Sequence, residues 1–278
     1  DDPYRCAYFS LMRMLYEHNP VREEVAGTVE SIAGITADTL YTCHAAFYNP
    51  KNMVLCAAGD FDPQKIYDIA MEELGDKDGI SPEVDFGEEE SCFPLEKYSE
   101  LNMEVSAPQF FIGAKISPIP RGEALLRQKI VSQLALRTLF GRSGNFYNSM
   151  YSDGLLNREF DFETDYVAGT GTVIFEGESR EPRTVLAEII RAVNEVREKG
   201  LDRDLFRRAK KASYGARLRG LESFDTVCLS AMDGYFEGYE PMASFDVLES
   251  VTVEECEAFL TEYLAEDRLA LSVVLPLK

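Results

Sequence analysis

The sequence predicts an α+β protein of two related domains, each an antiparallel or mixed sheet with helices packed on one side, and the first only partly present. Two observations support this fold class. The pattern of residues 36–60 recurs without a gap in residues 252–275, at an offset of 216 residues. Each copy starts with a Thr, continues as a helix and ends in an apolar run, so we interpret it as one supersecondary unit used twice. The strands and helices expected between the copies do not alternate strictly, which argues against a doubly wound parallel sheet.

The repeat also predicts the domain boundaries. The second copy occupies about 175 residues, whereas only about the last third of the first copy precedes residue 60. We therefore predict that residues 1–76 are the C-terminal part of a first domain and that residues 101–278 are a complete second domain. Residues 77–100 are the expected linker, because Gly, Pro and acidic residues accumulate there. Its acidic run, 88–90, is more typical of a solvated linker than of a docking surface.

Helix and strand signals in the first 76 residues follow one another closely. Asp2 and Pro3 start a helix whose apolar residues recur at helical spacing as far as Leu15. Thr36 caps the next helix, which Asn49-Pro50 ends. Residues 53–58 form a continuous apolar run of strand length, and a further helix is expected over 62–74.

The remaining chain contains more helix than strand. Prolines at 108 and 118 bound the strand predicted over 109–116. The GTG of residues 169–171 lies between an alternating run over 160–166 and a further strand over 172–175, which predicts a hairpin. The other expected elements are helices over 123–140, 182–199, 202–221 and 223–236, a short helix and loop within 141–154, and a short connection over 246–250.

Composition excludes several classes of partner. The chain carries 49 acidic and 28 basic residues, a formal net charge of -21, which repels nucleic acid and anionic lipid. No apolar run approaches the roughly 18 residues of a spanning helix. The six cysteines show no CxxC and no framework spacing, so we expect reduced thiols and a cytoplasmic protein.

The residues offer little chemistry. His18 and His44 are the only histidines, and they lack the spacing of a catalytic zinc site; Cys43 and His44 alone are a weak metal-binding candidate. No nucleophile elbow, phosphate loop or dinucleotide fingerprint occurs, and Gly169-Thr170-Gly171 is more typical of a hairpin turn. Asp161, Glu163 and Asp165 alternate as expected for the solvated face of a strand.

One stretch resembles a known family. Residues 27–63, GTVESIAGITADTLYTCHAAFYNPKNMVLCAAGDFDP, are similar to the segment that follows the metal site in the insulinase (pitrilysin) family of zinc metallopeptidases. Residues 160–179, FDFETDYVAGTGTVIFEGES, resemble the bacterial members encoded by two genes. The matching positions of the first stretch are Gly27, Glu30, Ile32, Phe47-Tyr48, Pro50, Asn52-Met53 and Gly59-Asp60-Phe61-Asp62.

The resemblance implies paired two-domain units that close on an unfolded peptide. It also implies a zinc held by the two histidines of an HxxEH helix and a downstream glutamate, with the motif's own Glu as general base. HxxEH is absent here, and the third ligand would be expected before Asp1. We therefore assign no catalytic and no metal residue, leave the substrate-binding residues unknown, and expect zinc in the full-length parent but none in this chain.

A second family element concerns an Arg and a Tyr that orient substrate in the partner unit. The matching stretch is MYSDGLLN, residues 150–157, where Tyr151 lies near the Arg position and Asn157 at the Tyr position. Because both family residues are missing, the chain resembles the metal-bearing subunit.

Our first hypothesis is an N-terminally truncated fragment of a zinc-dependent endopeptidase, inactive alone; whether the chain is an enzyme stays open. The alternative is a non-catalytic, peptidase-like binding or assembly subunit, and a third possibility is an acidic α+β domain of unrelated function. The expected partners are a peptide substrate of the parent and a homologous partner subunit or a second copy of the chain, with no nucleic acid and no membrane.

Overall fold

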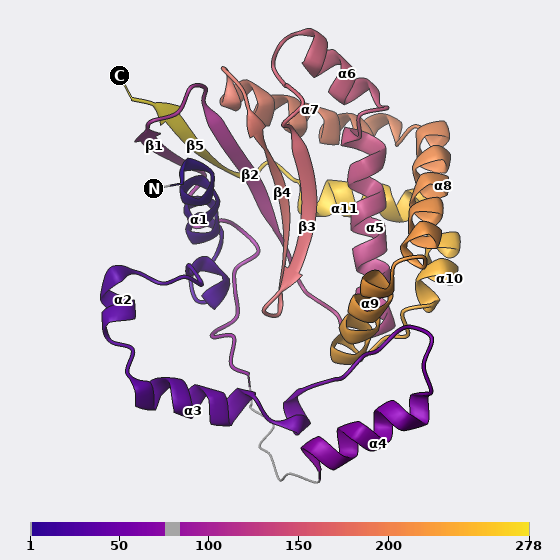
Figure 1. The fold of residues 1–278 in the computed structure, drawn as a ribbon. Coiled ribbons are helices and arrows are strands. Elements are labelled where there is room, and N and C mark those ends of the chain that lie inside the picture. Colours follow the sequence, from indigo (N-terminus) through magenta and orange to yellow (C-terminus); the bar gives the residue numbers. More distant parts are fainter. Residues whose placement is uncertain (1, 76–83, 278) are drawn as a thin grey trace. The chain divides into compact units, whose positions relative to one another are not determined.

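The protein is an α+β fold built on one five-stranded mixed sheet (Figure 1). The computed structural model describes residues 2–75 and 84–277, so residues 77–83 of the predicted linker lie outside the described residues. The strand order is β1-β5-β2-β4-β3, with β1 parallel to β5 and the other neighbours antiparallel. The strands are β1 (Tyr98–Met103), β2 (Gln109–Ile116), β3 (Asp161–Val167), β4 (Thr170–Glu178) and β5 (Ala270–Pro276).

Most predicted elements are confirmed. Strand β2 and two long helices, α5 (Glu123–Phe140) and α7 (Pro182–Lys199), have the predicted bounds, because prolines and glycines mark their ends. The other helices are α1 (Pro3–Leu15), α2 (Val29–Ala33), α3 (Ala37–Phe47), α4 (Pro63–Leu74), α6 (Asn145–Ser152), α8 (Arg203–Gly220), α9 (Phe224–Glu237), α10 (Ala243–Ser250) and α11 (Val253–Tyr263).

The two faces of the sheet are covered by different helices. Phe175 of β4 contacts Phe140 of α5, with ring centroids 4.8 Å apart. Its neighbour Ile174 points to the other face, where it belongs to a buried cluster with residues of α1. Helices α5, α7 and α11 therefore line one face, and α1 lies against β1, β5 and β2 on the other (Figure 1).

Helix α1 is held by an apolar stripe. Ala7, Leu11, Met12 and Leu15 are fully buried, as the helical spacing of the sequence predicts. Gly113 of β2 permits this close approach, since a Cβ there would lie 2.9 Å from Cδ2 of Leu11. The helix predicted to belong to the first domain thus packs on the sheet of the second.

The chain divides into two compact units. Unit 1 comprises residues 1–23, 86–217 and 242–278 and contains the sheet. Unit 2 comprises residues 24–85 and 218–241. Helices α2, α3 and α4 of unit 2 contain no buried residue, so the described part of this unit has little apolar core of its own.

The two copies of the repeat agree in their helices and differ in their strands. Helices α3 and α11 both have 11 residues, start 216 positions apart and are capped by a Thr, namely Thr36 and Thr252. The second copy ends in β5, but the strand predicted over 53–58 is wrong, because these residues pair with none of the strands in the described part of the chain. An apolar run forms a strand only where a neighbour supplies hydrogen bonds.

Two further elements differ from the expectation. Residues 243–250 form helix α10 instead of a short connection, and its Leu248 is buried. Strand β1 was not predicted, because its sequence, YSELNM, shows no clear apolar alternation. It pairs in parallel with β5 from Tyr98↔Leu271 to Met103↔Pro276, so its position depends on a contact that is distant in sequence.

Candidate functional site

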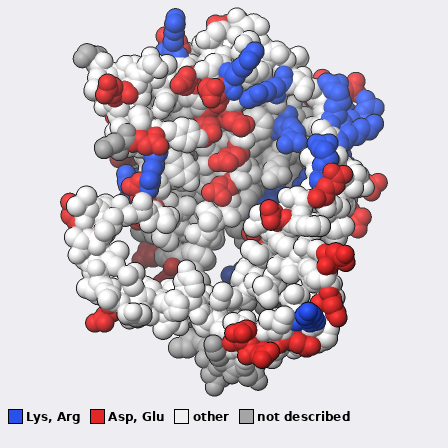
Figure 2. Space-filling view, in the orientation of Figure 1, with Lys and Arg blue, Asp and Glu red and all other residues white. Residues whose placement is uncertain are grey.

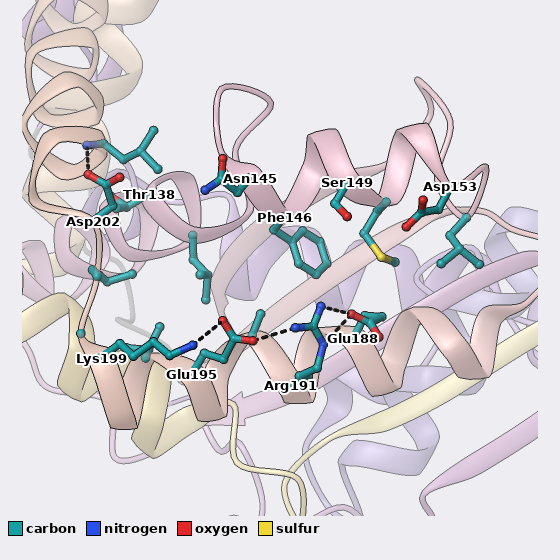
Figure 3. A pocket seen from close by; sticks show the side chains of 18 residues that line it. Thr138, Asn145, Phe146, Ser149, Asp153, Glu188, Arg191, Glu195, Lys199 and Asp202 are labelled. Atoms are coloured by element: carbon teal, nitrogen blue, oxygen red, sulfur yellow. Dashed lines mark hydrogen bonds and ion pairs between the residues drawn. The ribbon is translucent and has the colours of Figure 1, made fainter.

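One candidate is a groove of about 500 Å³ in unit 1, lined by residues of α5, α6, α7 and the start of α8 (Figure 3). Phe146 and Met150 of α6 supply an apolar side. The charged side of α7 runs along the opposite wall, and Asp202 lies at the end of the groove. Asp202 accepts hydrogen bonds from the backbone N–H groups of residues 204 and 205, so its carboxylate caps α8.

The acidic and basic side chains of the charged wall pair with one another, so their charges balance. Arg191 donates to Oε2 of Glu188 at 2.8 Å and to Oε1 of Glu195 at 2.7 Å, and Nζ of Lys199 lies 3.7 Å from Oε2 of Glu195 (Figure 3). These residues are three or four positions apart, so one helical face brings them together. Ser149 is present, but the described lining includes no His or Cys to activate it. The groove therefore presents an apolar side and a charge-balanced side along its length.

A second candidate is the buried cluster around Lys115 of β2. Its side chain is 2% exposed, donates to the carbonyl oxygen of Leu15 and lies 3.7 Å from Oε2 of Glu90. Its Nζ is also 5.3 Å from the ring centroid of Tyr16. Burial lowers the pKa of Lys115 below its usual value, although Glu90 opposes that shift. A lysine with a lowered pKa is a candidate base, but substrate cannot reach an Nζ this buried, so its role is structural.

Glu90 departs from the interpretation of the acidic run as solvated, whereas Glu88 and Glu89 are exposed as predicted. Its side chain is 13% exposed and accepts the backbone N–H groups of Glu17, His18 and Asn19 at 2.7–3.1 Å. Burial alone would raise the pKa of Glu90, but these three donors and Lys115 outweigh it and lower the pKa. Glu90 therefore fixes residues near the end of the predicted linker to the C-terminal end of α1.

The acidic residues of β3 lie on the sheet face that carries α1. They alternate along the strand as predicted, and Asp161 pairs with Glu176 of β4. Burial raises the pKa of Glu163, with further increases from Glu176, Asp165 and Asp161. Burial also raises the pKa of Asp165, partly offset by the N–H of Tyr166 and by Lys129. Tyr4 of α1 donates to Glu176, so the face is only partly solvated.

The histidines do not form a metal site. His18 is exposed, with Nε2 3.7 Å from Glu17 and 3.9 Å from Glu88. His44 stacks on Tyr48 at 5.0 Å, and the neighbouring Cys43 is exposed. Within residues 2–75 and 84–277, no group of three His, Cys, Asp or Glu could hold a metal ion. The described side chains therefore do not fit a catalytic zinc.

The substrate-orienting positions of the resemblance have local structural roles. Tyr151 is 47% exposed on α6 and stacks on Tyr147 at 5.8 Å. Asn157 donates to Oε2 of Glu178 at 3.1 Å and accepts the backbone N–H of Glu159 at 2.9 Å. These contacts organise the loop before β3, and neither residue lines the groove.

In the segment that resembles the family, side-chain hydrogen bonds hold the turn that follows α3. Nδ2 of Asn52 donates to the carbonyl oxygen of Phe47 at 3.0 Å, which closes the C-terminal end of α3. Asn49 accepts the N–H of Lys51 through its side chain, and Pro50 opens the short 3₁₀ helix Pro50–Asn52. The motif residues therefore build a helix end and not a reactive site.

A five-stranded mixed sheet backed by helices, with a groove beside α7 in unit 1, places the chain in the α+β class. The family model described as the peptidase M16 inactive domain matches residues 34–213, and the chain belongs to this family. The resemblance to the insulinase family of zinc peptidases is thereby confirmed.

Individual relatives agree with this assignment. The chain is 32% identical to the uncharacterized zinc protease YmfH of Bacillus subtilis (strain 168), over 99% of this chain and 65% of that protein. An M16-like peptidase from Alicyclobacillus acidocaldarius has a TM-score of 0.92 and 30% identity, covering 100% of this chain and 67% of the other. A protease from Helicobacter pylori shares the fold, with a TM-score of 0.82, 14% identity and coverage of 99% and 68%. The chain thus spans about two thirds of the length of these proteins.

Proposed function

We propose that this chain is the non-catalytic part of a zinc-dependent endopeptidase of the M16 family that acts on peptides, and that it cleaves no peptide alone. One observation carries the proposal: the match to the inactive domain coincides with described residues that offer no three-ligand metal group. The relative YmfH is named a zinc protease. We infer that residues other than those described here hold the zinc of the intact enzyme.

The role of the chain in that enzyme would be to bind peptide and to assemble with a homologous partner subunit or a second copy. The groove beside α7 supports the binding role, because it is open, partly apolar and about 500 Å³ in volume. Exposed Leu40, Tyr41 and Phe47 of α3 support assembly. The net charge of -21 opposes nucleic acid and anionic membranes, and no described helix is long and apolar enough to cross a bilayer. The unpaired cysteines support a cytoplasmic location.

Metal analysis and a cleavage assay test this function. The purified chain is dialysed, analysed for zinc by mass spectrometry, and incubated with fluorescently quenched casein with and without added zinc. We expect far less than one zinc per chain and no cleavage in either condition. One zinc retained per chain together with cleavage would contradict the proposal.

The alternative is an assembly subunit of a parent that has itself lost catalysis. It shares the support of the first function, namely the match to the inactive domain and described residues that offer no three-ligand metal group. The same two measurements on the intact protein that contains this chain separate the two functions. Stoichiometric zinc with cleavage supports the peptidase, and a zinc-free intact protein that binds casein without cutting it supports the assembly subunit.

A further inference from the structure

Helix α8 concentrates positive charge in an acidic protein. Its 18 residues, RDLFRRAKKASYGARLRG, include seven Lys or Arg and one Asp, whereas the whole chain has 28 basic residues and a net charge of -21. Figure 2 shows Lys and Arg side chains gathered over the region that Figure 1 labels α8. A positively charged segment on a negatively charged protein attracts acidic partners to that part of the surface.

The basic side chains form one exposed face. Arg207, Arg208 and Lys211 are exposed and lie within about a third of the helix circumference. The opposite side of the helix contains the buried residues Ala209 and Ser213. We call Arg207, Arg208 and Lys211 the α8 basic face. It belongs to unit 1, where it is attached to the body that contains the sheet.

Acidic side chains of the same protein neutralise this face only in part. Arg207 donates to Asp204, and Arg203, one turn earlier, donates to Oε1 of Glu254 at 2.8 Å. Arg208 and Lys211 form no ion pair with any residue in the described ranges, 2–75 and 84–277. Arg208 also attracts the nearby carboxylate of Asp202 without forming an ion pair with it, and both Arg208 and Lys211 remain exposed to carboxylates from outside.

Lys210 differs from these residues. Its Nζ donates to the carbonyl oxygens of Glu249 at 2.6 Å and Val251 at 2.8 Å, at the end of α10. That contact caps α10 and joins it to α8. Lys210 is thus a structural residue, and a binding argument uses only Arg208 and Lys211.

A shallow hollow adjoins the face. It has a volume of about 270 Å³ and is lined by Arg207, Lys210, Lys211, Tyr214, Leu248 and Glu249. Tyr214 is 41% exposed, and its ring contacts Phe245 edge-on at 5.3 Å. The exposed part of the Tyr214 ring offers an apolar surface beside the two unpaired cations. A binding partner could therefore insert an apolar side chain while its carboxylates meet Arg208 and Lys211.

We propose that the α8 basic face, together with the hollow at Tyr214, binds an acidic helical segment of a partner protein. An acidic partner complements the positive charge of the face. Arg208 and Lys211 lie three positions apart on one side of α8, a spacing that carboxylates on one side of a partner helix can match. Nucleic acid fits less well, because a long polyanion would run beyond α8 onto a surface whose net charge is negative. The proposal is independent of peptidase activity.

The test uses the full 278-residue chain and a fluorescein-labelled helical peptide of Glu and Ala with one Leu per turn, followed by fluorescence anisotropy. We expect binding at about 50 mM NaCl that weakens at about 300 mM. Arg208→Gln with Lys211→Gln should weaken binding about tenfold. The matched control, Arg121→Gln with Arg180→Gln, removes the same charge from two other exposed positions and should change binding by less than about twofold.

A second variant separates docking from charge attraction. Tyr214→Ala should weaken binding of the Leu-containing peptide about fivefold but leave a Leu-to-Ala peptide unaffected. Circular dichroism of each variant establishes that it is folded. Absence of binding, equal losses in the two double variants, or tighter binding of oligouridylate through the same two residues would each overturn the proposal.

Discussion

Glu90 shows at the scale of one residue how a carboxylate acquires a role that its local sequence conceals. It stands in a run of three glutamates, which is typical of solvated linkers. In the structure it accepts N–H groups about 70 positions earlier in the chain and faces Lys115. A buried charge is tolerated only when donors or counter-charges surround it, and here both do. No feature within a few residues of Glu90 could have indicated those partners.

Removing this carboxylate should destabilise unit 1. We expect Glu90→Ala to lower the free energy of unfolding by about 3 kcal/mol. The substitution leaves Lys115 buried without its counter-charge and leaves three backbone N–H groups without their acceptor. Urea unfolding followed by circular dichroism measures the change. The exposed neighbour serves as control: Glu89→Ala should cost less than about 0.5 kcal/mol. Equal effects of the two substitutions would show that Glu90 is not a buried partner of Lys115.

The same difference should depend on pH. The pKa of Glu90 is lowered in the folded protein, from an ordinary value of 4.5. The carboxylate therefore contributes its full stabilisation above pH 4.5 and loses it as the pH falls through the lower, folded pKa. The difference in free energy of unfolding between wild type and Glu90→Ala should be constant near neutral pH and should shrink as the pH falls below 4.5.

At the scale of elements, the repeat shows which local signals are decisive. Thr36 and Thr252 each accept an N–H three residues later, so the caps that the sequence indicates fix the starts of α3 and α11. The apolar runs that follow are similar in sequence, yet only the second becomes a strand. β5 lies between β1 and β2, whereas residues 53–58 have no neighbouring strand among those described. Caps and stops are local and predictable, and strand pairing is not.

The candidate site follows the same division. The bounds of α7, and hence the spacing of Arg191 and Glu195, could be predicted from Pro182 and Gly200. The groove could not, because it requires α6 to lie opposite α7, and no local pattern specifies that packing. The burial of Leu248 of α10 likewise cannot be predicted locally, since it depends on packing against another helix. The absence of HxxEH, by contrast, was visible from the residues alone.

The equivalent caps of α11 and α3 allow the contribution of the two copies of the repeat to stability to be compared. Thr252 and Glu255 form a reciprocal capping box, and Arg127 of α5 donates two hydrogen bonds to Glu255. We expect Thr252→Ala to lower the free energy of unfolding by about 1 kcal/mol. Thr36→Ala removes the equivalent cap of α3, whose helix contains no buried residue.

Because α3 contributes little to the core, the Thr36 variant should leave the urea midpoint of unit 1 unchanged and reduce only the helical signal. Circular dichroism across the urea series measures both quantities. A loss at Thr36 as large as that at Thr252 would show that the two copies are equally integrated into the fold.

At the scale of the whole molecule, stability is unevenly divided along the chain. Unit 1 contains the sheet and the buried stripe of α1. In unit 2, helices α2, α3 and α4 bury no residue, and large side chains such as Ile32, Leu40 and Phe47 are at least half exposed. Segments with few buried apolar contacts open at low free-energy cost, so they are also the segments that a partner could order.

Limited proteolysis should reveal this division. Trypsin is expected to cleave after Lys51 and Lys65 well before it cleaves inside α5 or α7, at Lys129 or Arg191, because cleavage requires local unfolding. Mass spectrometry of a time course identifies the order of cuts. Lys65 and Lys129 are the matched pair, since both lie within helices. Helix α4, which contains Lys65, has no buried residue, whereas α5, which contains Lys129, has many. Cleavage of the two at equal rates would mean that residues 24–75 are as firmly packed as the sheet.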